Sequence, residues 1–325
     1  MTRLSAITPS GHAHLGNHLG AIRRWATQGR QGDLYFVSDL HAMTVSYNPA
    51  RLRVLSRELL AVLVAAGIDP DQVFVQSDLV RELGALSWIL ECACSYGEAA
   101  RMTQFKQKSG TSGEPVGTVR LGLLTYPVLM AADILLQGAA EVPVGDDQAQ
   151  HVELARTLAR RFNQTYGDVF IVPKAVTPPT AARVRDLTDP GRKMSKSTQD
   201  SVGVVFILDD PDLVHRKIKR AVTDSLERME YRPTEQPGLA NLLEILSACT
   251  DTAPGDLAAQ YSTYGALKAA TAEAVVEELR PIRERAQELI ADPAELDRIR
   301  KAGAHRAAER GAHRLSSALR LAGVA

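Results

Sequence analysis

The sequence predicts an α/β fold in which a Rossmann-like parallel-sheet domain is followed by an all-helical domain. In the first half, short apolar runs alternate with longer segments whose apolar residues recur at helical spacing. This alternation is typical of parallel strands joined by right-handed helical crossovers. Beyond residue 208 the strand-like runs stop and helical patterns continue. A chain of 325 residues has the length of about two domains.

In the first domain, strands are expected at 4–7, 34–37, 73–75 and 142–144. Leucines at helical spacing predict a helix over 51–66, which Gly67 and Pro70 end. Further helical segments are predicted at 19–25, 82–94 and 147–166, and the polar stretch 106–117 is predicted to be an exposed loop. Ligands in such sheets bind at the carboxyl ends of the strands, where strand order reverses.

The second half begins with a last strand-like run at 204–208. Helices are then predicted over 211–222, 239–248, 268–290 and 294–321. We therefore expect a sheet domain at 1–190, a mobile loop at 191–203 and a helical domain at 204–325.

The composition narrows the class of protein. Lysine plus arginine equals aspartate plus glutamate, 38 each, which argues against a general nucleic-acid coat but leaves room for a local basic patch. Three cysteines without framework spacing indicate a reducing compartment. Cys92 and Cys94 lie in an apolar helical run and are expected to be buried packing thiols rather than metal ligands. With no signal peptide or membrane-length apolar run, a cytoplasmic protein is expected.

The most specific segment of the chain is Arg192-Lys193-Met194-Ser195-Lys196-Ser197, directly after Asp189-Pro190-Gly191. Lysine is a strong point charge for phosphate. A flexible loop with Lys193 and Lys196 is suited to close on a leaving pyrophosphate, where negative charge develops in the transition state. The alternative is a solvated basic turn, but this full combination of residues is improbable by chance.

A second phosphate-type segment lies about 180 residues earlier, at Pro9 to Asn17. It contains Ser10 and ends in His14-Leu15-Gly16-Asn17, between a short apolar strand and an amphipathic stretch. Gly16 lets a ligand approach the backbone without a Cβ in the way, and His14 and Asn17 carry donors for phosphate oxygens. Alone, the segment is equally compatible with a helix entry that has incidental histidines. Together the two segments indicate a site that holds ATP from both ends and acts on its α-phosphate.

These two segments resemble the signature pair of class I aminoacyl-tRNA synthetases. The asparagine at position 17 is similar to the tryptophanyl branch, and the likeness extends over most of the chain. It is carried by the following stretches: Asp39 to Thr44, Glu98 to Lys108, Leu124 to Leu135, Val142 to His151 and Ala221 to Ser225. The resemblance to bacterial tryptophanyl-tRNA synthetases implies a Rossmann-like catalytic domain and a helical domain that binds the tRNA anticodon.

The resemblance also implies the roles of individual residues. Phosphates are assigned to Asn17, Lys193, Ser195 and Lys196, with His14 beside them. The rest of the ATP site is assigned to Thr8, Ser10, Gly16, Gln104, Lys108, Gly145, Asp147, Val184 and Met194. For Val184 and Met194 the backbone is expected to receive the adenine. ATP with Mg²⁺ is the expected cosubstrate, and no dedicated protein metal site is expected because the phosphates hold the ion.

The tryptophan pocket is assigned by resemblance to Leu4, Ala6, His41, Tyr126, Met130, Asp133 and Gln148. Asp133 resembles the aspartate that accepts the indole N–H in the family, and indole nitrogen can only donate. A charge within the apolar run 131–135 is otherwise expected to be paired. Met130 is expected to pack on the indole ring, and Tyr126 and Gln148 to hold the ammonium and carboxylate. Taken alone, Met130 and Tyr126 are also compatible with ordinary core positions.

The chain departs from the family pattern in its first strand. Leu4, Ala6 and Thr8 stand where the family usually has Phe, Gly and Gln. Because of this departure, the sequence does not predict the affinity for tryptophan and its analogues. It also does not distinguish a housekeeping copy of the enzyme from an auxiliary copy.

The resemblance implies tRNA(Trp) and L-tryptophan as partners and a homodimer without membrane association. The C-terminal arginines are expected to contact tRNA phosphates; they are Arg298, Arg300, Arg306, Arg310, Arg314 and Arg320, together with Lys301. A solvated helix face is the alternative for each of them. Two other functions stay open: a tyrosyl-tRNA synthetase on the same fold, and a non-catalytic paralogue.

Overall fold

A computed structural model describes residues 2–102, 120–177, 184–195, 201–226 and 228–324. In these ranges the parallel strands are β1 (Leu4–Ile7), β2 (Leu34–Val37), β3 (Val73–Val75), β4 (Glu141–Pro143) and β5 (Lys174–Val176). β1, β2 and β3 pair in that order, and β4 pairs with β5. A parallel bridge between Arg3 and Glu141 joins the two groups, so the full order is β5-β4-β1-β2-β3. The predicted strands of the first domain are confirmed, and β1 lies at the centre.

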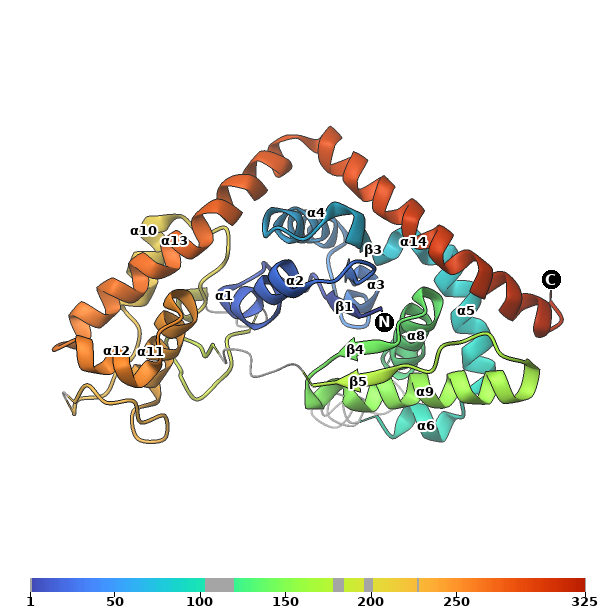
Figure 1. Cartoon of the computed structure of the whole chain (residues 1–325), viewed down its shortest axis with the longest axis horizontal. Helices are drawn as coiled ribbons and strands as arrows, with labels where there is room; N and C mark the ends of the chain where they lie inside the picture. The colour runs from blue at the N-terminus through green and yellow to red at the C-terminus, as the bar shows by residue number, and fades with distance from the viewer. Residues whose placement is uncertain (1, 103–119, 178–183, 196–200, 227, 325) are drawn as a thin grey trace.

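The sheet is covered on both faces, as its fully buried strands β2 and β3 require. Leu34 and Phe36 belong to the core cluster beneath α5 (Val80–Ala93), α8 (Leu121–Gln137) and α9 (Asp146–Tyr166). The alternate residues Tyr35 and Val37 belong to the cluster beneath α4 (Pro49–Ala65). Figure 1 shows α4 on one side of the strands and α8 with α9 on the other.

Short elements complete the first domain: α1 (Leu15–Asn17), η1 (His18–Ile22), α2 (Arg23–Gln28), α3 (Asp39–Ala42), η2 (Pro70–Gln72), η3 (Gln76–Leu79) and α6 (Tyr96–Ala100). The helices predicted at 51–66, 82–94 and 147–166 occur within two residues of their expected limits, whereas the segment predicted at 19–25 extends over η1 and α2 to Gln28. One expectation about them is wrong. Cys92 is exposed, because it lies on the outer face of α5, opposite the buried Leu83, Leu86 and Leu90.

The second half contains η5 (Ser201–Gly203), α10 (Pro211–Lys219), α11 (Pro237–Thr250), α12 (Pro254–Gln260), α13 (Tyr264–Ala291) and α14 (Pro293–Leu321). The predicted helices are present, and α12 was not predicted. The strand expected at 204–208 is absent. This run forms only an isolated antiparallel bridge, from Phe206 to His14, because its partner is a short loop and not the sheet.

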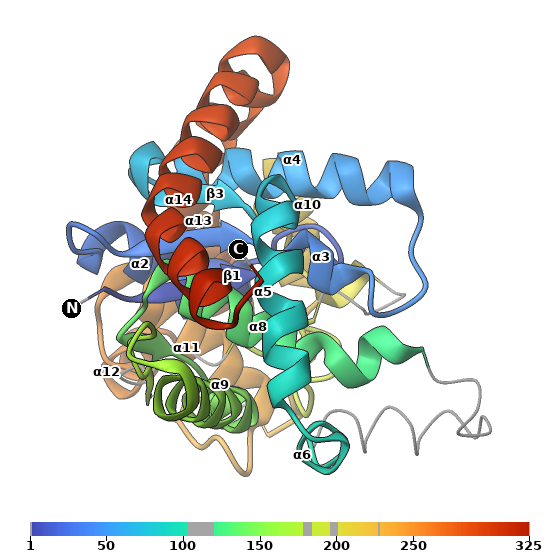
Figure 2. The same cartoon turned by 90° about the vertical axis from the view of Figure 1, so that its right-hand side faces the viewer.

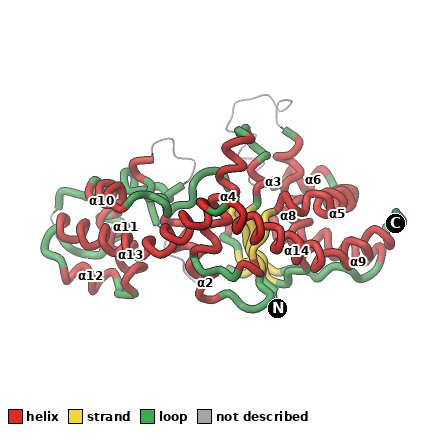
Figure 3. The backbone as a smooth tube through the Cα atoms, turned by 90° about the horizontal axis from the view of Figure 1, so that it is seen from above, coloured by secondary structure: helices red, strands yellow, loops and turns green. Residues whose placement is uncertain are grey.

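The last two helices span the whole molecule. α13 packs against α4, α10 and α11, whereas α14 turns back over β3, α8 and η2. Figures 1 and 2 show α14 descending along the sheet domain, and from above the strands lie between α10–α12 and α14 (Figure 3). Residues 204–325 were expected to form one helical domain, but the structure divides them, since α14 packs on the sheet domain.

Small residues allow this close contact of α14. A Cβ on Gly303 would lie 2.0 Å from the carbonyl oxygen of Val73, so only glycine fits there.

In the described part of the chain, no helix combines the length and apolar character needed to cross a bilayer.

Candidate functional site

The carboxyl end of β1 is open to solvent at Ala6. Ala6 is exposed although β1 is the central strand, which requires open space above it. Thr8 follows on the same face, and its hydroxyl is 2.9 Å from the hydroxyl of Ser38, at the end of β2. Leu4 was assigned to the tryptophan pocket, but it is 2% exposed and belongs to the core cluster of Leu34 and Phe36.

The segment after β1 forms a hydrogen-bonded turn that starts α1. The His14 N–H donates to Asn17 Oδ1 at 3.2 Å, and the Asn17 N–H donates to His14 Nδ1 at 3.3 Å. This reciprocal capping box fixes both side chains. An Nδ1 that accepts leaves the ring proton of neutral His14 on Nε2. A Cβ on Gly16 would lie 3.1 Å from the His14 ring, so the turn favours glycine.

The base of the lysine loop is a short hairpin. The Met194 N–H donates to Val184 O at 3.2 Å, and the Asp186 N–H donates to Arg192 O at 3.0 Å. Lys193 on this hairpin is exposed and Ser195 is half-buried. Lys196 lies outside the described residues. The structure therefore places the first lysine of the loop on the surface, at a position where it can meet an anion.

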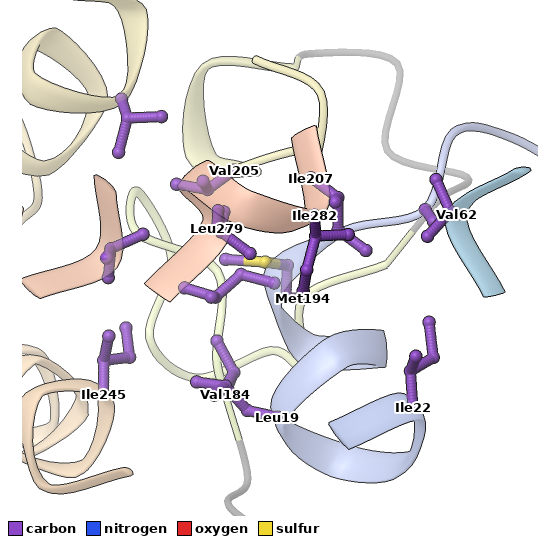
Figure 4. Close-up of a cluster of buried hydrophobic side chains, with 14 of the residues drawn as sticks. Leu19, Ile22, Val62, Val184, Met194, Val205, Ile207, Ile245, Leu279 and Ile282 are labelled. Atoms are coloured by element: carbon purple, nitrogen blue, oxygen red, sulfur yellow. The ribbon is translucent and has the colours of Figure 1, made fainter. Parts of the chain in front are cut away.

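The side chains of Val184 and Met194 belong to the hydrophobic core. Their side chains are 2% and 1% exposed, and Figure 4 shows them packed between Leu19 of η1 and Leu279 of α13. The Met194 N–H and the Val184 carbonyl bond each other, and the expectation that the backbone around these two residues receives adenine stays a prediction.

The two signature segments meet in one hydrogen-bonded unit. The Leu15 N–H donates to Val205 O at 2.8 Å, and the Ile207 N–H donates to Ala13 O at 2.9 Å. The Leu187 N–H, within the hairpin, donates to Gly203 O at 2.9 Å. The run that follows the lysine loop therefore holds both the hairpin and the turn before α1. This brings together segments that lie about 180 residues apart in the sequence.

A buried lysine fastens this unit. Lys217 of α10 donates to Val204 O at 2.8 Å and to Asp209 Oδ2 at 2.7 Å, and its ammonium lies 4.8 Å from the centre of the Phe206 ring. The residue is 6% exposed. A buried ammonium requires such partners, and the bonds fix the run 204–209 to the helical domain.

Asp133 is the carboxylate of the expected amino-acid pocket, and it is buried. It is 3% exposed. Gln76 Nε2 donates to its two oxygens at 3.0 and 2.8 Å, and His41 Nε2 lies 3.0 Å from Oδ2. Burial raises the pKa of Asp133, and the hydrogen bond from His41 opposes that shift. The structure thus brings Asp133 and His41 together as predicted, and it adds Gln76.

Tyr126, Met130 and Asp133 follow one another at the spacing of one helix face. The Tyr126 hydroxyl is 2.9 Å from His151 Nε2, and the Tyr126 ring meets the His41 ring edge to face at 6.1 Å. Burial raises the pKa of Tyr126 to about 12. Met130 is half-buried beside the core. This face of α8 therefore presents an aromatic ring, a thioether and a carboxylate.

The remaining assigned residues lie around the same edge. Gly145 precedes α9, and the Gln148 N–H donates to its carbonyl at 3.0 Å. Ser10 is exposed and Gln148 is half-buried. Gln104, Lys108 and the Asp147 side chain lie outside the described residues.

Most of the C-terminal basic residues are engaged within the chain. Arg300 pairs with Asp78, Arg306 with Asp71, and Arg298 with Glu295. Arg310 donates to Gln137 O, and Arg314 donates to Leu136 O. Four of these arginines, Arg300, Arg306, Arg310 and Arg314, fasten α14 to the sheet domain, whereas Arg298 pairs within α14. Their contact with tRNA stays a prediction.

Comparison with known proteins agrees with this architecture. Residues 1–280 match the family described as tRNA synthetases class I (W and Y). The tryptophan–tRNA ligase 1 of Streptomyces coelicolor is 56% identical over 312 residues, which cover 94% of this chain and 93% of that protein. The tryptophanyl-tRNA synthetase of Mycoplasma pneumoniae has a TM-score of 0.85 at 34% identity and covers 100% of this chain and 98% of its own.

A second solved structure includes ligands. The tryptophanyl-tRNA synthetase of Campylobacter jejuni, complexed with ADP and tryptophan, has a TM-score of 0.85 at 31% identity over 99% of this chain and 100% of its own. The fold and the paired signature segments thus define an ATP-dependent class I synthetase. The chain belongs to the class I tRNA synthetases for tryptophan and tyrosine.

Sequence reasoning missed three groups of this site. Gln76 directly follows β3, where the rule for parallel sheets places ligands, so its position was the available signal. Lys217 lies in a basic helical stretch, and nothing in the sequence marks this lysine as the buried one. His18, 3% exposed and 2.7 Å from Glu278 on α13, joins residues too distant in sequence to pair without a structure.

Proposed function

We propose that this chain is a tryptophan–tRNA ligase. It activates L-tryptophan with ATP to give tryptophanyl-adenylate and pyrophosphate, and then transfers the amino acid to tRNA(Trp). The observation that carries this proposal is Asp133, a buried carboxylate held by Gln76 and His41 on the same helix face as Tyr126 and Met130. Such a group suits an amino acid whose ring carries a single N–H donor.

Selection of tryptophan follows from the cost of leaving that carboxylate unsatisfied. An indole N–H adds a hydrogen bond to Asp133, whereas phenylalanine would cover a buried charge without one. Met130 and the His41 ring pack against the indole, and Tyr126 with Gln148 holds the ammonium and carboxylate. Ala6 leaves room over the centre of the sheet for the adenylate.

Activation is an in-line attack of the tryptophan carboxylate on the α-phosphorus of ATP, with pyrophosphate as the leaving group. Lys193, Ser195 and Lys196 bind the leaving phosphates, and His14 and Asn17 bind from the opposite segment. Mg²⁺ enters with ATP as part of the substrate. No side chain acts as a general base, because catalysis comes from positioning and charge stabilisation.

The second step transfers the tryptophanyl group to a ribose hydroxyl at the end of the tRNA. We assign the anticodon to the helical unit formed by α10 to α13, since α14 is bound to the sheet domain. The substrates place the reaction in the cytoplasm. We also propose a homodimer that uses the outer face of α5 and its neighbours, where Trp88 is 68% exposed, Tyr96 71% and Leu121 78%.

The test is ATP–pyrophosphate exchange with tryptophan, tyrosine and phenylalanine in parallel, followed by charging of tRNA(Trp). We expect exchange with tryptophan alone. Exchange driven by tyrosine would reassign the substrate, and no exchange together with capture of a protein partner would favour a non-catalytic paralogue. Light scattering on the same preparation is expected to give twice the chain mass of 35.2 kDa; a single-chain mass would exclude the dimer.

A further inference from the structure

Gln76 is a fully buried residue whose polar groups are all in use. It lies at the carboxyl end of β3 and is 0% exposed. Its Oε1 accepts from the Leu40 N–H at 3.0 Å, and its Nε2 donates to Asp133 Oδ2 at 2.8 Å and Oδ1 at 3.0 Å. Because the Leu40 N–H can only donate, Oε1 must face Leu40, so the amide N–H groups must face Asp133.

This arrangement fixes a torsion that is otherwise soft. The terminal torsion of an aspartate is broad, so a carboxylate with one partner turns easily. Asp133 is held at three points, by the two contacts from Gln76 and by His41 Nε2 at 3.0 Å on Oδ2. Two of these contacts fall on Oδ2 and one on Oδ1. A carboxylate has about four acceptor sites, so Oδ1 retains more capacity for a further donor.

The frame that holds Gln76 is itself braced. The next residue, Ser77, donates to the Asp39 carboxylate through its N–H at 2.9 Å and its hydroxyl at 2.6 Å. Asp39 begins α3, the short helix that also carries Leu40 and His41. The two consecutive residues Gln76 and Ser77 therefore bind α3 on one side and α8 on the other. Gln76 and His41, the two residues that touch Asp133, are therefore both positioned by the contact between Ser77 and Asp39.

We propose that Gln76 is a positioning residue that determines specificity: it orients the Asp133 carboxylate so that Oδ1 accepts the ring N–H of the amino-acid substrate. This inference rests on the proposed function of Asp133 in recognising tryptophan. Gln76 does not touch the substrate and acts through Asp133. Its loss therefore reduces the selection of a ring donor more than it reduces catalysis.

The experiment compares tryptophan with 3-(3-benzothienyl)alanine, in which sulfur replaces the ring N–H at similar shape. ATP–pyrophosphate exchange gives kcat/KM for both amino acids. Gln76→Met keeps the chain length and removes the donor. Gln137→Met is the matched control, because Gln137 is 1% exposed on the same helix as Asp133 and donates instead to Ala307 O at 3.1 Å.

We expect the preference of the unmodified protein for tryptophan to fall at least about tenfold in Gln76→Met, with a higher KM for tryptophan and a smaller change in kcat. Gln137→Met is expected to keep the full preference. If Gln76→Met does not fold, Gln76→Asn keeps an amide but withdraws it from Asp133, and it is expected to lose part of the preference while melting cooperatively.

Two results would overturn the inference. The first is an unchanged preference in a folded Gln76 variant, which would assign Gln76 to structure alone. The second is an unmodified protein that exchanges with both amino acids equally, which would remove Asp133 as the ring acceptor. Failure of the proposed function looks different, because the unmodified protein would then show no exchange with tryptophan at all.

Discussion

At the scale of single residues, Glu98 shows how one carboxylate joins two elements. Arg161 of α9 binds its two oxygens at 2.7 and 3.1 Å, and the N–H and hydroxyl of Ser95 donate to it at 2.8 and 2.9 Å. These donors, Arg161 above all, lower the pKa of Glu98 from its ordinary 4.5 to about 2. The contacts of Glu98 therefore stabilise the folded protein more than an isolated surface ion pair would.

This shift predicts how stability depends on pH. The pKa of Glu98 is lower in the folded state than in the unfolded state, so its contribution is present above 4.5 and is lost as pH falls toward about 2. Glu98→Gln is therefore expected to destabilise the protein most at neutral pH, with a difference that shrinks below pH 4.5. Urea unfolding of both proteins at pH 7, 4 and 3 measures this.

The control is Glu153→Gln, which removes a more exposed pair with Arg156 on the same helix. It is expected to change the free energy of unfolding by less than about 0.5 kcal/mol. A destabilisation by Glu98→Gln that is the same at all three pH values would contradict the assignment.

Single residues also show what the sequence was able to predict. Asp133 was identifiable because a charge within an apolar helix requires an explanation, and the pair of signature segments was identifiable by composition. Gln76 offered only the weaker signal of its position after a strand, because its role becomes visible only when its two partners are seen. Sequence gives the type of each group, but the pairing of Gln76 with Asp133 and Leu40 depends on packing across three elements.

At the scale of elements, the lysine loop depends on a glycine at its far end. A Cβ on Gly203 would lie 1.9 Å from Asp186 Oδ1 and 2.6 Å from Thr188 Oγ1. Asp186 is 1% exposed and accepts from the N–H and hydroxyl of Thr188 at 2.8 and 2.7 Å. An alanine at this position must therefore displace the buried carboxylate that shapes the hairpin.

Gly203→Ala is expected to lower the free energy of unfolding by roughly 1–3 kcal/mol and to reduce the rate of adenylate formation, since the hairpin also carries Lys193. Denaturant unfolding and single-turnover adenylate formation measure the two effects. Gly255→Ala is the control, because a Cβ there meets nothing within 4 Å. Equal behaviour of the two variants would show that the hairpin does not need this contact.

Element types were more predictable than their partners. Short strands and amphipathic helices follow from apolar spacing, and the predicted limits of α4, α5 and α9 were confirmed to within two residues. The run 204–208 misled, because five consecutive apolar residues, most of them β-branched or aromatic, are the pattern of a buried strand. Its backbone pairs instead with residues 13–15, a contact that no local pattern contains.

At the scale of the whole molecule, the helical unit reaches the site through the turn that starts α1. His18 follows Asn17 directly and is 3% exposed. Its Nε2 lies 2.7 Å from Glu278 Oε1 on α13, and the Arg23 guanidinium lies 3.6 Å from the same oxygen. The hydrogen bond from His18 is the largest cause of a lowered pKa for Glu278. The proposed anticodon-binding unit and the proposed phosphate-binding turn are thus joined by a largely buried hydrogen bond between His18 and Glu278.

The domains of the folded chain differ from those that the sequence predicted. The sequence predicted a boundary near residue 204, and the basic pattern of α14 suggested a surface for tRNA. Both expectations rest on local composition, which does not record that Gly303 and Arg310 face β3 and the end of α8. Long-range packing decides which domain a terminal helix joins.

Glu278→Ala tests the connection between the two units. The change leaves the buried His18 ring without its partner, which costs about 1–3 kcal/mol of unfolding free energy. It also loosens the turn that holds His14 and Asn17 relative to α13. We therefore expect lower stability together with a raised KM for ATP, and a smaller effect on the KM for tryptophan, whose pocket lies on α8. Thermal unfolding and exchange kinetics measure these quantities.

Glu273→Ala on the same helix is the matched control. Glu273 also faces a histidine, His215, but at 3.6 Å and with side chains 68% and 43% exposed. Exposed pairs of this kind contribute little, so this variant is expected to keep both stability and the KM for ATP. If Glu278→Ala behaved like Glu273→Ala, the hydrogen bond between His18 and Glu278 would be incidental. The orientation of the turn would then depend on the backbone bonds to Val205 and Ile207 alone.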